Sequence, residues 1–229
     1  MSGIPVLTID GPSGSGKGTI SREVARRLGW HLLDSGALYR VVALAGAMQH
    51  LNPQDVEGHT RIAAGLHLKF GARPDGSELT LLGDPGADVT DRIRTEEAGQ
   101  GASRVAAWPA VRSALLQRQR DFAASPGLVA DGRDMGTVVF PTAPLKVFLT
   151  ASPEERARRR HKQLKDKGSG VSLAALSREI AERDERDSKR SVAPLVPADD
   201  AVVVDSTHLD IAQVVAQVLE LTRRLGWLA

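Results

Sequence analysis

A glycine-rich segment near the start of the chain, IDGPSGSGKGT (residues 9–19), contains the residue types that bind phosphate. Glycines let a backbone fold closely around an anion, so that consecutive N–H groups face its oxygens. The usual pattern of such a loop is G-x-x-x-x-G-K-[ST]. Gly11, Gly16 and Lys17 fit it. Gly18, however, stands where a metal-binding hydroxyl is expected, and Thr19 follows one residue late. The segment predicts a phosphate site but leaves open what holds a metal.

The residues on either side of this loop fit a strand and a helix. The run 6–9 is apolar and β-branched, which is typical of a buried strand. Apolar residues then recur at helical spacing over 20–28, and Gly29 can end that helix. A loop between a strand and a helix points the helix N-terminus at the phosphates, and Lys17 can reach the phosphoryl group in transfer.

The loop indicates a nucleoside triphosphate but not a reaction. A GTPase needs an N-K-x-D guanine-reading motif, and the only asparagine of the chain is Asn52, in LNPQ. A motor ATPase is usually larger than 229 residues. A small-molecule kinase remains.

Further strand patterns alternate with helical ones. Alternating strands and helices predict an α/β fold of the P-loop NTPase type, with a parallel five-stranded sheet covered by helices on both faces. Ligands of such sheets bind at the carboxyl ends of the strands, where we find four aspartates. The expected strands are 6–9, 31–33, 128–131, 145–149 and 201–205, and the aspartates are Asp10, Asp34, Asp131 and Asp205.

Two segments look inserted into this pattern. Residues 66–82 alternate apolar with polar side chains around a turn signal at 74–76, which predicts a small antiparallel β insert. The second insert follows the fourth strand. Ser152 can cap its first helix, with Pro153 at the first helical position and a glutamate at the capping-box position, and we expect that helix to end near Gly168.

The charge of the chain is unevenly distributed. The formal net charge is +2, but residues 156–190 carry twelve Lys and Arg against six Asp and Glu, or +6, which leaves −4 for the remainder. A local positive field suits a phosphorylated ligand. A solvated helix face is the alternative, and nucleic-acid binding is a third interpretation that 3% aromatic residues support poorly.

The helix expected after Ser172 changes character along one face. Leu173, Leu176 and Ile180 form an apolar stripe at steps of three and four residues. Its continuation is ionic and consists of Arg183, Asp187 and Arg190. Such a helix leaves the core and enters a polar cleft, where two arginines can hold a phosphoryl group in transfer. The alternative is a surface ion pair at i,i+4 spacing.

The segment VADGRDMGTVVF places polar residues at the end of the third strand. Asp131 ends the strand, as a metal-associated acid of a phosphate-loop enzyme does, although a turn or helix-cap aspartate is the alternative. Arg133 and Asp134 follow in the turn, on the ligand side of the sheet.

Four motifs in this order resemble the bacterial cytidylate kinase family: DGPSGSGKGT, HLLDSGALYR, ADGRDMGTVVFP and ERDERDSKR…PLVPADDAVVVDST. The first is shared by many nucleotide kinases, whereas the other three are specific. The resemblance extends from Ile4 to about Thr207. It implies Mg²⁺-dependent phosphoryl transfer from ATP to CMP or dCMP, and kinases of UMP or AMP are the alternative.

The resemblance also implies the site residues. Gly11, Pro12, Ser13, Gly14, Ser15, Gly16, Lys17, Gly18 and Thr19 would bind ATP, and Lys17, Arg133, Arg183 and Arg190 would be catalytic. The CMP-binding residues would be Ser35, Tyr39, Arg40, Ser103, Arg112, Arg133, Asp134, Arg183, Asp187 and Arg190. The lid arginines Arg156, Arg158, Arg159 and Arg160 receive no individual roles.

Within that family the chain would be one kinase unit in three parts. The core would comprise 1–36, 110–152 and 191–229, the monophosphate-binding subdomain about 37–109, and the lid about 153–190. Because relatives share the G-K-G-T form, we expect no direct protein ligand to Mg²⁺. Asp131 would orient its water ligands, and Thr19 would turn its hydroxyl or N–H toward the α-phosphate.

The composition of the chain indicates the cellular compartment in which the protein works. There are no cysteines, which fits a reducing cytoplasm. No apolar run approaches the roughly 20 residues of a membrane span, and the first residues do not resemble a signal peptide. We expect a cytoplasmic monomer with no nucleic-acid or membrane partner.

Overall fold

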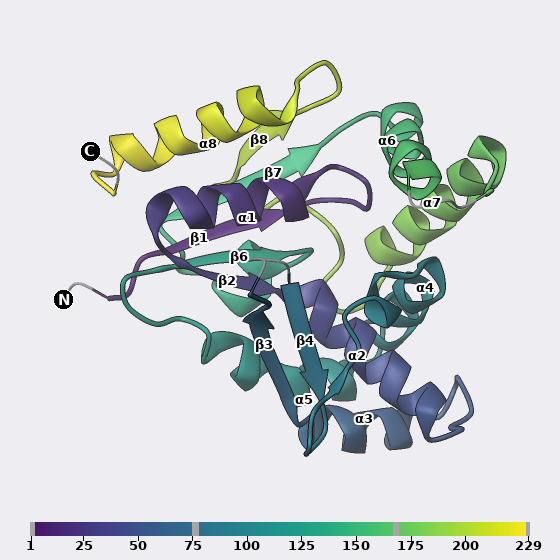
Figure 1. Ribbon diagram of the computed structural model, residues 1–229. Helices are drawn as coiled ribbons and strands as arrows, with labels where there is room; N and C mark the ends of the chain where they lie inside the picture. Colours follow the sequence, from purple (N-terminus) through teal and green to yellow (C-terminus); the bar gives the residue numbers. More distant parts are fainter. Residues whose placement is uncertain (1–2, 75–77, 167–169, 228–229) are drawn as a thin grey trace. The chain divides into compact units, whose positions relative to one another are not determined.

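The computed structural model describes residues 3–74, 78–166 and 170–227. The chain divides into two compact units. The first consists of Met1–Asp34 and Gln119–Ala229, and the second is Ser35–Arg118. Figure 1 shows the helices and strands of both units.

The first unit is built on a parallel five-stranded sheet, as predicted. Its strands lie in the order β2-β6-β1-β7-β8. In register, Asp34 pairs with Asp131 and Asp10 pairs with Gly132, so the aspartates gather at one edge of the sheet. The strands are β1 (Val6–Asp10), β2 (His31–Asp34), β6 (Leu128–Gly132), β7 (Leu145–Thr150) and β8 (Val202–Asp205).

Helices flank this sheet. α1 (Lys17–Leu28) and α8 (Ile211–Arg224) pack side by side, and their apolar side chains form a core with strand residues such as Ile9 and Leu149 (Figure 1). All five residues of β1 and of β6 are buried. Because successive side chains of a strand point to opposite faces, both faces of these central strands are covered. α1 ends at Gly29, whose φ of 65° is left-handed, as the sequence predicted.

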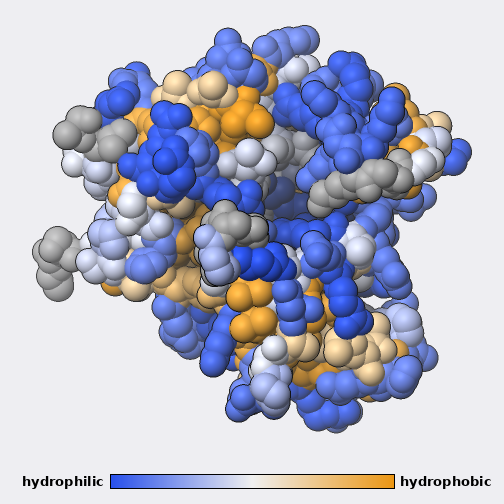
Figure 2. Space-filling view, in the orientation of Figure 1, coloured by the Kyte–Doolittle hydropathy of each residue, from blue (hydrophilic) through white to orange (hydrophobic). Residues whose placement is uncertain are grey.

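A pair of packed helices follows β7, where the second insert was expected: α6 (Pro153–Asp166) and α7 (Leu173–Ser188). The surface over them is mostly hydrophilic (Figure 2). Ser152 caps α6, because its Oγ accepts from the Glu155 amide at 3.2 Å. The rest of the capping box is wrong, since the amide of Ser152 donates to Thr207 Oγ1. The predicted end near Gly168 lies outside the described residues.

The apolar stripe of α7 begins later than predicted. Leu176 and Ile180 are buried, but Leu173 is 42% exposed. Leu173 opens the helix next to its N-cap Ser172, so the first turn lies at the surface and burial begins one turn further along.

The second unit contains helices and a separate antiparallel sheet. The sheet confirms the β insert and has the order β3-β4-β5. Its third strand was not predicted, because two residues are too short for a periodic pattern. Asp75 and Gly76 of the expected turn lie outside the described residues. The elements are α2 (Ser35–Met48), α3 (Val56–Ala64), β3 (Leu68–Ala72), β4 (Glu78–Leu82), β5 (Ala87–Asp88), a 3-10 turn (Arg92–Arg94), α4 (Glu96–Val105) and α5 (Pro109–Arg120).

Candidate active site

The glycine loop lies between β1 and α1, at the carboxyl edge of the sheet. Gly14 and Gly16 have φ of 77° and 90°, which favours glycine. At Gly11 the reason is space, because a Cβ would lie 2.0 Å from the carbonyl oxygen of Leu149 in the neighbouring strand. Gly16 is the N-cap of α1 and provides no side-chain cap. The first amides of α1 are thus available to an anion.

Lys17 and Thr19 start α1. The Lys17 side chain is buried, and its Nζ donates to the carbonyl of Pro12 at 3.0 Å, back across the loop. A lysine in this position can exchange that carbonyl for a phosphate oxygen. The amide of Thr19 donates to the carbonyl of Gly16 at 3.1 Å. The Thr19 side chain is exposed, and the expected place of its hydroxyl or N–H near the α-phosphate stays a prediction.

Gly18 faces the end of β6. A Cβ at this position would lie 3.3 Å from Oδ2 of Asp131, a carboxylate that is 7% exposed. The buried carboxylate therefore lies against the position where many phosphate loops have a hydroxyl. Among the described residues there is no group of three or more His, Cys, Asp or Glu side chains that could hold a metal ion. Magnesium prefers oxygen ligands, keeps several waters and is bound through one or two carboxylates and substrate phosphates, so a single acid fits it.

Three arginines contact Asp187, which the structure buries to 3% exposure. Arg133 Nε donates to its Oδ2 at 3.1 Å, and Arg183 Nε lies 3.9 Å from the same oxygen. Arg190 lies past the end of α7 and its Nε donates to the Asp187 carbonyl at 3.2 Å. Arg183 also donates to Ser13 Oγ of the glycine loop at 3.4 Å. The predicted ionic helix face was wrong for Arg190, because α7 ends before this residue. Arg183 and Asp187 do lie on the helix, their burial excludes a surface ion pair, and Arg183 reaches the glycine loop.

Asp10 lies at the same edge and was not among the predicted site residues. Its carboxylate accepts from the amides of Met135 and Gly136, both at 2.8 Å. These residues open a π-helical turn directly after Asp134. Burial raises the pKa of Asp10 to about 7, the two backbone bonds oppose the rise, and the nearby carboxylates of Asp134 and Asp131 add to it. The only sequence signal that Asp10 lies at the site was its position at the end of a strand.

In the second unit, the predicted residues lie on helices α2, α4 and α5. Ser35, Tyr39 and Ser103 are buried, as is Arg112. The guanidinium of Arg112 lies over the Tyr39 ring, 5.8 Å from its centroid, and donates to the carbonyl of Ala106 at 3.3 Å. The structure brings Arg112 and Tyr39 together, although the two residues are more than 70 positions apart in the sequence.

The four arginines of α6 differ in their surroundings, which the sequence did not reveal. Arg158 is exposed and pairs with Glu155 at 2.7 Å, and Arg160 donates to Gln163 at 2.8 Å. Arg156 and Arg159 instead donate to backbone carbonyls of the glycine loop. The three-residue spacing of Arg156 and Arg159 puts both on one helix face. Arg160, four residues after Arg156, lies on that face too, so spacing alone could not single out Arg156 and Arg159.

A parallel sheet with a glycine loop, a helix-opening lysine and arginines at its carboxyl edge defines a phosphate-loop nucleotide-binding protein.

Comparisons with known proteins narrow this class. The cytidylate kinase family model matches residues 7–224. The chain is 59% identical over 224 residues to the cytidylate kinase of Pseudomonas aeruginosa (strain LESB58), covering 98% of this chain and 97% of that one. It is 60% identical over 217 residues to that of Pseudomonas fluorescens (strain Pf0-1), covering 94% and 93%. For Stutzerimonas stutzeri (strain A1501) the identity is 57% over 216 residues, covering 94% of each. The chain belongs to the cytidylate kinase family.

Proposed function

We propose that the protein transfers the γ-phosphoryl group of ATP to CMP or dCMP, giving ADP and CDP or dCDP. The observation that carries this proposal is the family match over residues 7–224, supported by a glycine loop whose backbone suits phosphate. The family match favours this reaction over phosphorylation of UMP or AMP.

ATP would lie along the residues from Gly11 to Thr19. Amides of the loop and of the α1 N-terminus would face its phosphates, and Lys17 would move from the Pro12 carbonyl to an oxygen of the transferred group. Arg183 donates to Ser13 Oγ and is thereby held beside the loop. It would stabilise the charge that develops during transfer, together with Arg190 and Arg133.

The acceptor phosphate of CMP would be bound by Arg40, Arg133 and Arg190. Arg183 and Asp187 would lie near the pentose and the phosphates, which suits a buried carboxylate that already orients arginines. The acceptor is itself a phosphate oxygen, so no side-chain base is required. Positioning and charge neutralisation then supply most of the catalysis.

Cytosine would be recognised by Ser103, Arg112 and Asp134, with Ser35 and Tyr39 lining the monophosphate pocket. A carboxylate and a hydroxyl can accept from the exocyclic amine, and Arg112 can donate to the ring carbonyl. Uracil would present a carbonyl to Asp134 instead, which is repulsive, and mismatched polar groups of this kind discriminate strongly.

Mg²⁺ would be held by ATP oxygens and water, with Asp131 orienting the water ligands from beside Gly18. An ion bound there would neutralise part of the charge on the phosphates of ATP. Lys17 and the arginines would supply the remaining positive charge.

The same proposal divides the chain into three functional parts. Residues of about 153–190 would act as a lid, and residues of about 37–109 would form the monophosphate-binding subdomain. The core would comprise 1–36, 110–152 and 191–229. The protein works as a monomer. It acts in the cytoplasm with no nucleic-acid partner, and no helix in the described part of the chain combines the length and apolarity of a membrane span.

A coupled assay of ADP production tests this function with CMP, dCMP, UMP, AMP and dTMP as acceptors. We expect CMP and dCMP to be preferred, and a preference for UMP or AMP would contradict the proposal. Replacing Asp134 with Asn should reduce the CMP-to-UMP ratio of kcat/KM by about 10²-fold, because the amide can donate to a uracil carbonyl. An unchanged ratio would remove Asp134 from base recognition.

A further inference from the structure

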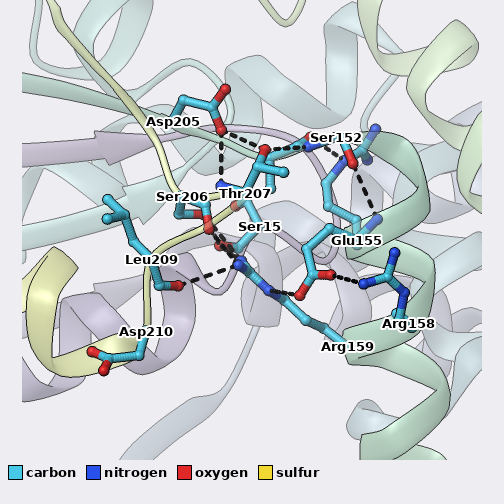
Figure 3. Close-up of polar contacts among 12 residues, drawn as sticks. Ser15, Ser152, Glu155, Arg158, Arg159, Asp205, Ser206, Thr207, Leu209 and Asp210 are labelled. Atoms are coloured by element: carbon cyan, nitrogen blue, oxygen red, sulfur yellow. Dashed lines mark hydrogen bonds and ion pairs between the residues drawn. The ribbon is translucent and has the colours of Figure 1, made fainter.

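Arg159 joins three segments that are distant in the sequence. From α6 it donates through Nη1 to the Ser15 carbonyl of the glycine loop at 3.3 Å. Nη1 also donates to Ser206 Oγ at 3.0 Å, and Nη2 donates to the carbonyls of Ser206 and Leu209. Figure 3 shows these contacts converging on one guanidinium. Arg159 thus ties α6 to the glycine loop and to the segment between β8 and α8.

The donors of Arg159 are fully used. A guanidinium group has five N–H donors. Nε donates to Glu155 at 3.0 Å, and the two terminal nitrogens make the four contacts to Ser15, Ser206 and Leu209. Five donors therefore meet five protein contacts, and a phosphate oxygen could bind Arg159 only by displacing one of them.

Arg156 makes the corresponding contact two residues earlier in the loop. It is 4% exposed, and its Nη1 donates to the carbonyl of Ser13 at 3.0 Å. Its Nε donates to the carbonyl of Ala151 at 3.0 Å, and its Nη2 pairs with Asp184 of α7 at 2.6 Å. The two arginines thus hold alternate carbonyls of the glycine loop.

These contacts fix the direction of the loop amides. In a trans peptide the C=O and the following N–H point in opposite directions. Holding the carbonyls of Ser13 and Ser15 against α6 therefore turns the N–H groups of Gly14 and Gly16 away from α6. Both glycines have positive φ, the conformation in which successive amides form an anion-binding concavity.

We propose that Arg159, together with Arg156, is a positioning residue that binds the outer carbonyls of the glycine loop and thereby holds its amides ready for the phosphates of ATP. This deepens the proposed function, since the nucleotide site is that of the kinase. Neither arginine contacts the nucleotide.

The test measures binding of ATP, ADP and inorganic tripolyphosphate by calorimetry to the full chain and to R159Q, R156Q and R158Q. R158Q is the matched control, because Arg158 is on the same helix, shares the partner Glu155 and makes no hydrogen bond to the glycine loop among the described residues. We expect R159Q and R156Q to weaken all three ligands alike, by at least about tenfold, since each loses a charged hydrogen bond to the loop. R158Q should stay within about twofold of the wild type.

Two results would overturn the proposal. The first is that R159Q binds all three ligands as tightly as R158Q does. The second is a loss for ATP and tripolyphosphate with ADP unaffected, which would indicate direct contact with the γ-phosphate. The KM for CMP should stay within about twofold in every variant, which also reports that the variant is folded.

Two further variants test the geometry even if R159Q fails to fold. R159K keeps the charge but not the planar fork, so it should bind the three ligands much more weakly than the wild type. Full recovery by lysine would contradict the role of the fork. Ser206→Ala removes one acceptor and should weaken binding of all three ligands by about two- to threefold, whereas unchanged binding would contradict a role of Ser206 in holding Arg159.

If the wild type binds tripolyphosphate and shows this pattern without phosphorylating CMP, the proposed function fails and this inference stands.

Discussion

Arg133 and Arg159 both belong to the sheet-containing unit, but their surroundings differ. Arg133 donates to the Asp187 carboxylate at 3.1 Å and to the Gly132 carbonyl at 3.2 Å. Its Nη2 makes no hydrogen bond within the described part of the chain. Every donor of Arg159 meets a protein acceptor, most of them backbone carbonyls. The first arrangement suits an anion that arrives with the substrate, and the second suits a permanent structural contact.

Whether an arginine near a phosphate site binds the substrate or holds the protein therefore depends more on its hydrogen-bond acceptors than on its position. Carbonyls, together with Ser206 Oγ, satisfy four of the contacts of Arg159, and the Glu155 carboxylate on Nε offsets its charge, so Arg159 serves to hold the loop. Arg133 is oriented by one carboxylate and keeps donors for a phosphate.

Replacing Lys17 with Ala should have the largest effect, because it removes the only loop side chain that can place a charge on the transferred phosphoryl group. We expect kcat to fall by about 10²- to 10³-fold, with the KM for CMP within a few-fold of the wild-type value. Steady-state kinetics in the coupled assay measure both. Near-normal turnover would show that the glycine loop is not the ATP site.

Replacing Arg133 with Gln should reverse the pattern expected for R159Q. The KM for CMP should rise by about 10- to 100-fold with a lower kcat, because the acceptor phosphate loses a charged hydrogen bond, while ATP binding should change by less than about twofold. Calorimetry and kinetics on the two variants side by side make this comparison. If both variants lost the same ligand, the distinction between the two arginines would be wrong.

The pKa of Asp10 predicts a pH-dependent stability. Its value is about 7 in the fold against an ordinary value of 3.8, so the folded chain holds the proton more tightly than the unfolded one. The stabilisation is complete below about pH 4 and is lost as the pH rises through 7. The free energy of unfolding of the wild type, minus that of Asp10→Asn, should therefore fall over this range, by as much as about 4 kcal/mol.

Urea unfolding of the nucleotide-free protein at several pH values measures this difference. Asp10→Asn is the informative variant, because it has the same shape and cannot titrate. A difference that stays constant between pH 4 and 7 would mean that Asp10 is ionised throughout, held so by its two backbone hydrogen bonds.

Gly18 should show the smallest effect. A Cβ would lie 3.3 Å from the Asp131 carboxylate, so Gly18→Ala and Gly18→Ser require a shift of a few tenths of an ångström. We expect both to lower kcat by about two- to fivefold, with stability changes under about 1 kcal/mol, since the helix propensity of the new residue offsets the strain. A serine variant more active than both the wild type and the alanine variant would show that a hydroxyl is useful here.

The sheet and α1 could be predicted because local patterns fix them. Apolar runs gave the five parallel strands, and Gly29 ended α1 where a left-handed residue was needed. The two-residue strand β5 could not be predicted, because its pairing depends on β4 and not on its own pattern. The predicted burial of Leu173 was wrong for a related reason. Apolar periodicity identifies one face of a helix, but it does not show at which turn that face becomes buried.

The site residues in the motifs could be predicted from their types, but the roles of the arginines in α6 could not. Arg156, Arg158, Arg159 and Arg160 form an almost continuous run in the sequence. Which of them meets a carbonyl depends on how α6 packs against the glycine loop and the segment after β8, which is a tertiary contact. The buried hydrogen bonds of Asp10 could not be predicted for the same reason, because its partners lie 125 and 126 positions away in the sequence.

A crystal structure of the full chain with Mg²⁺, ADP and CMP is the most direct test. We expect the amides of Gly14 and Gly16 on ADP phosphate oxygens, Arg133 on the CMP phosphate, and Arg159 still on the carbonyls of Ser15 and Ser206. A guanidinium of Arg159 bound to a phosphate oxygen, with its contact to the Ser15 carbonyl broken, would contradict the division of labour between these arginines.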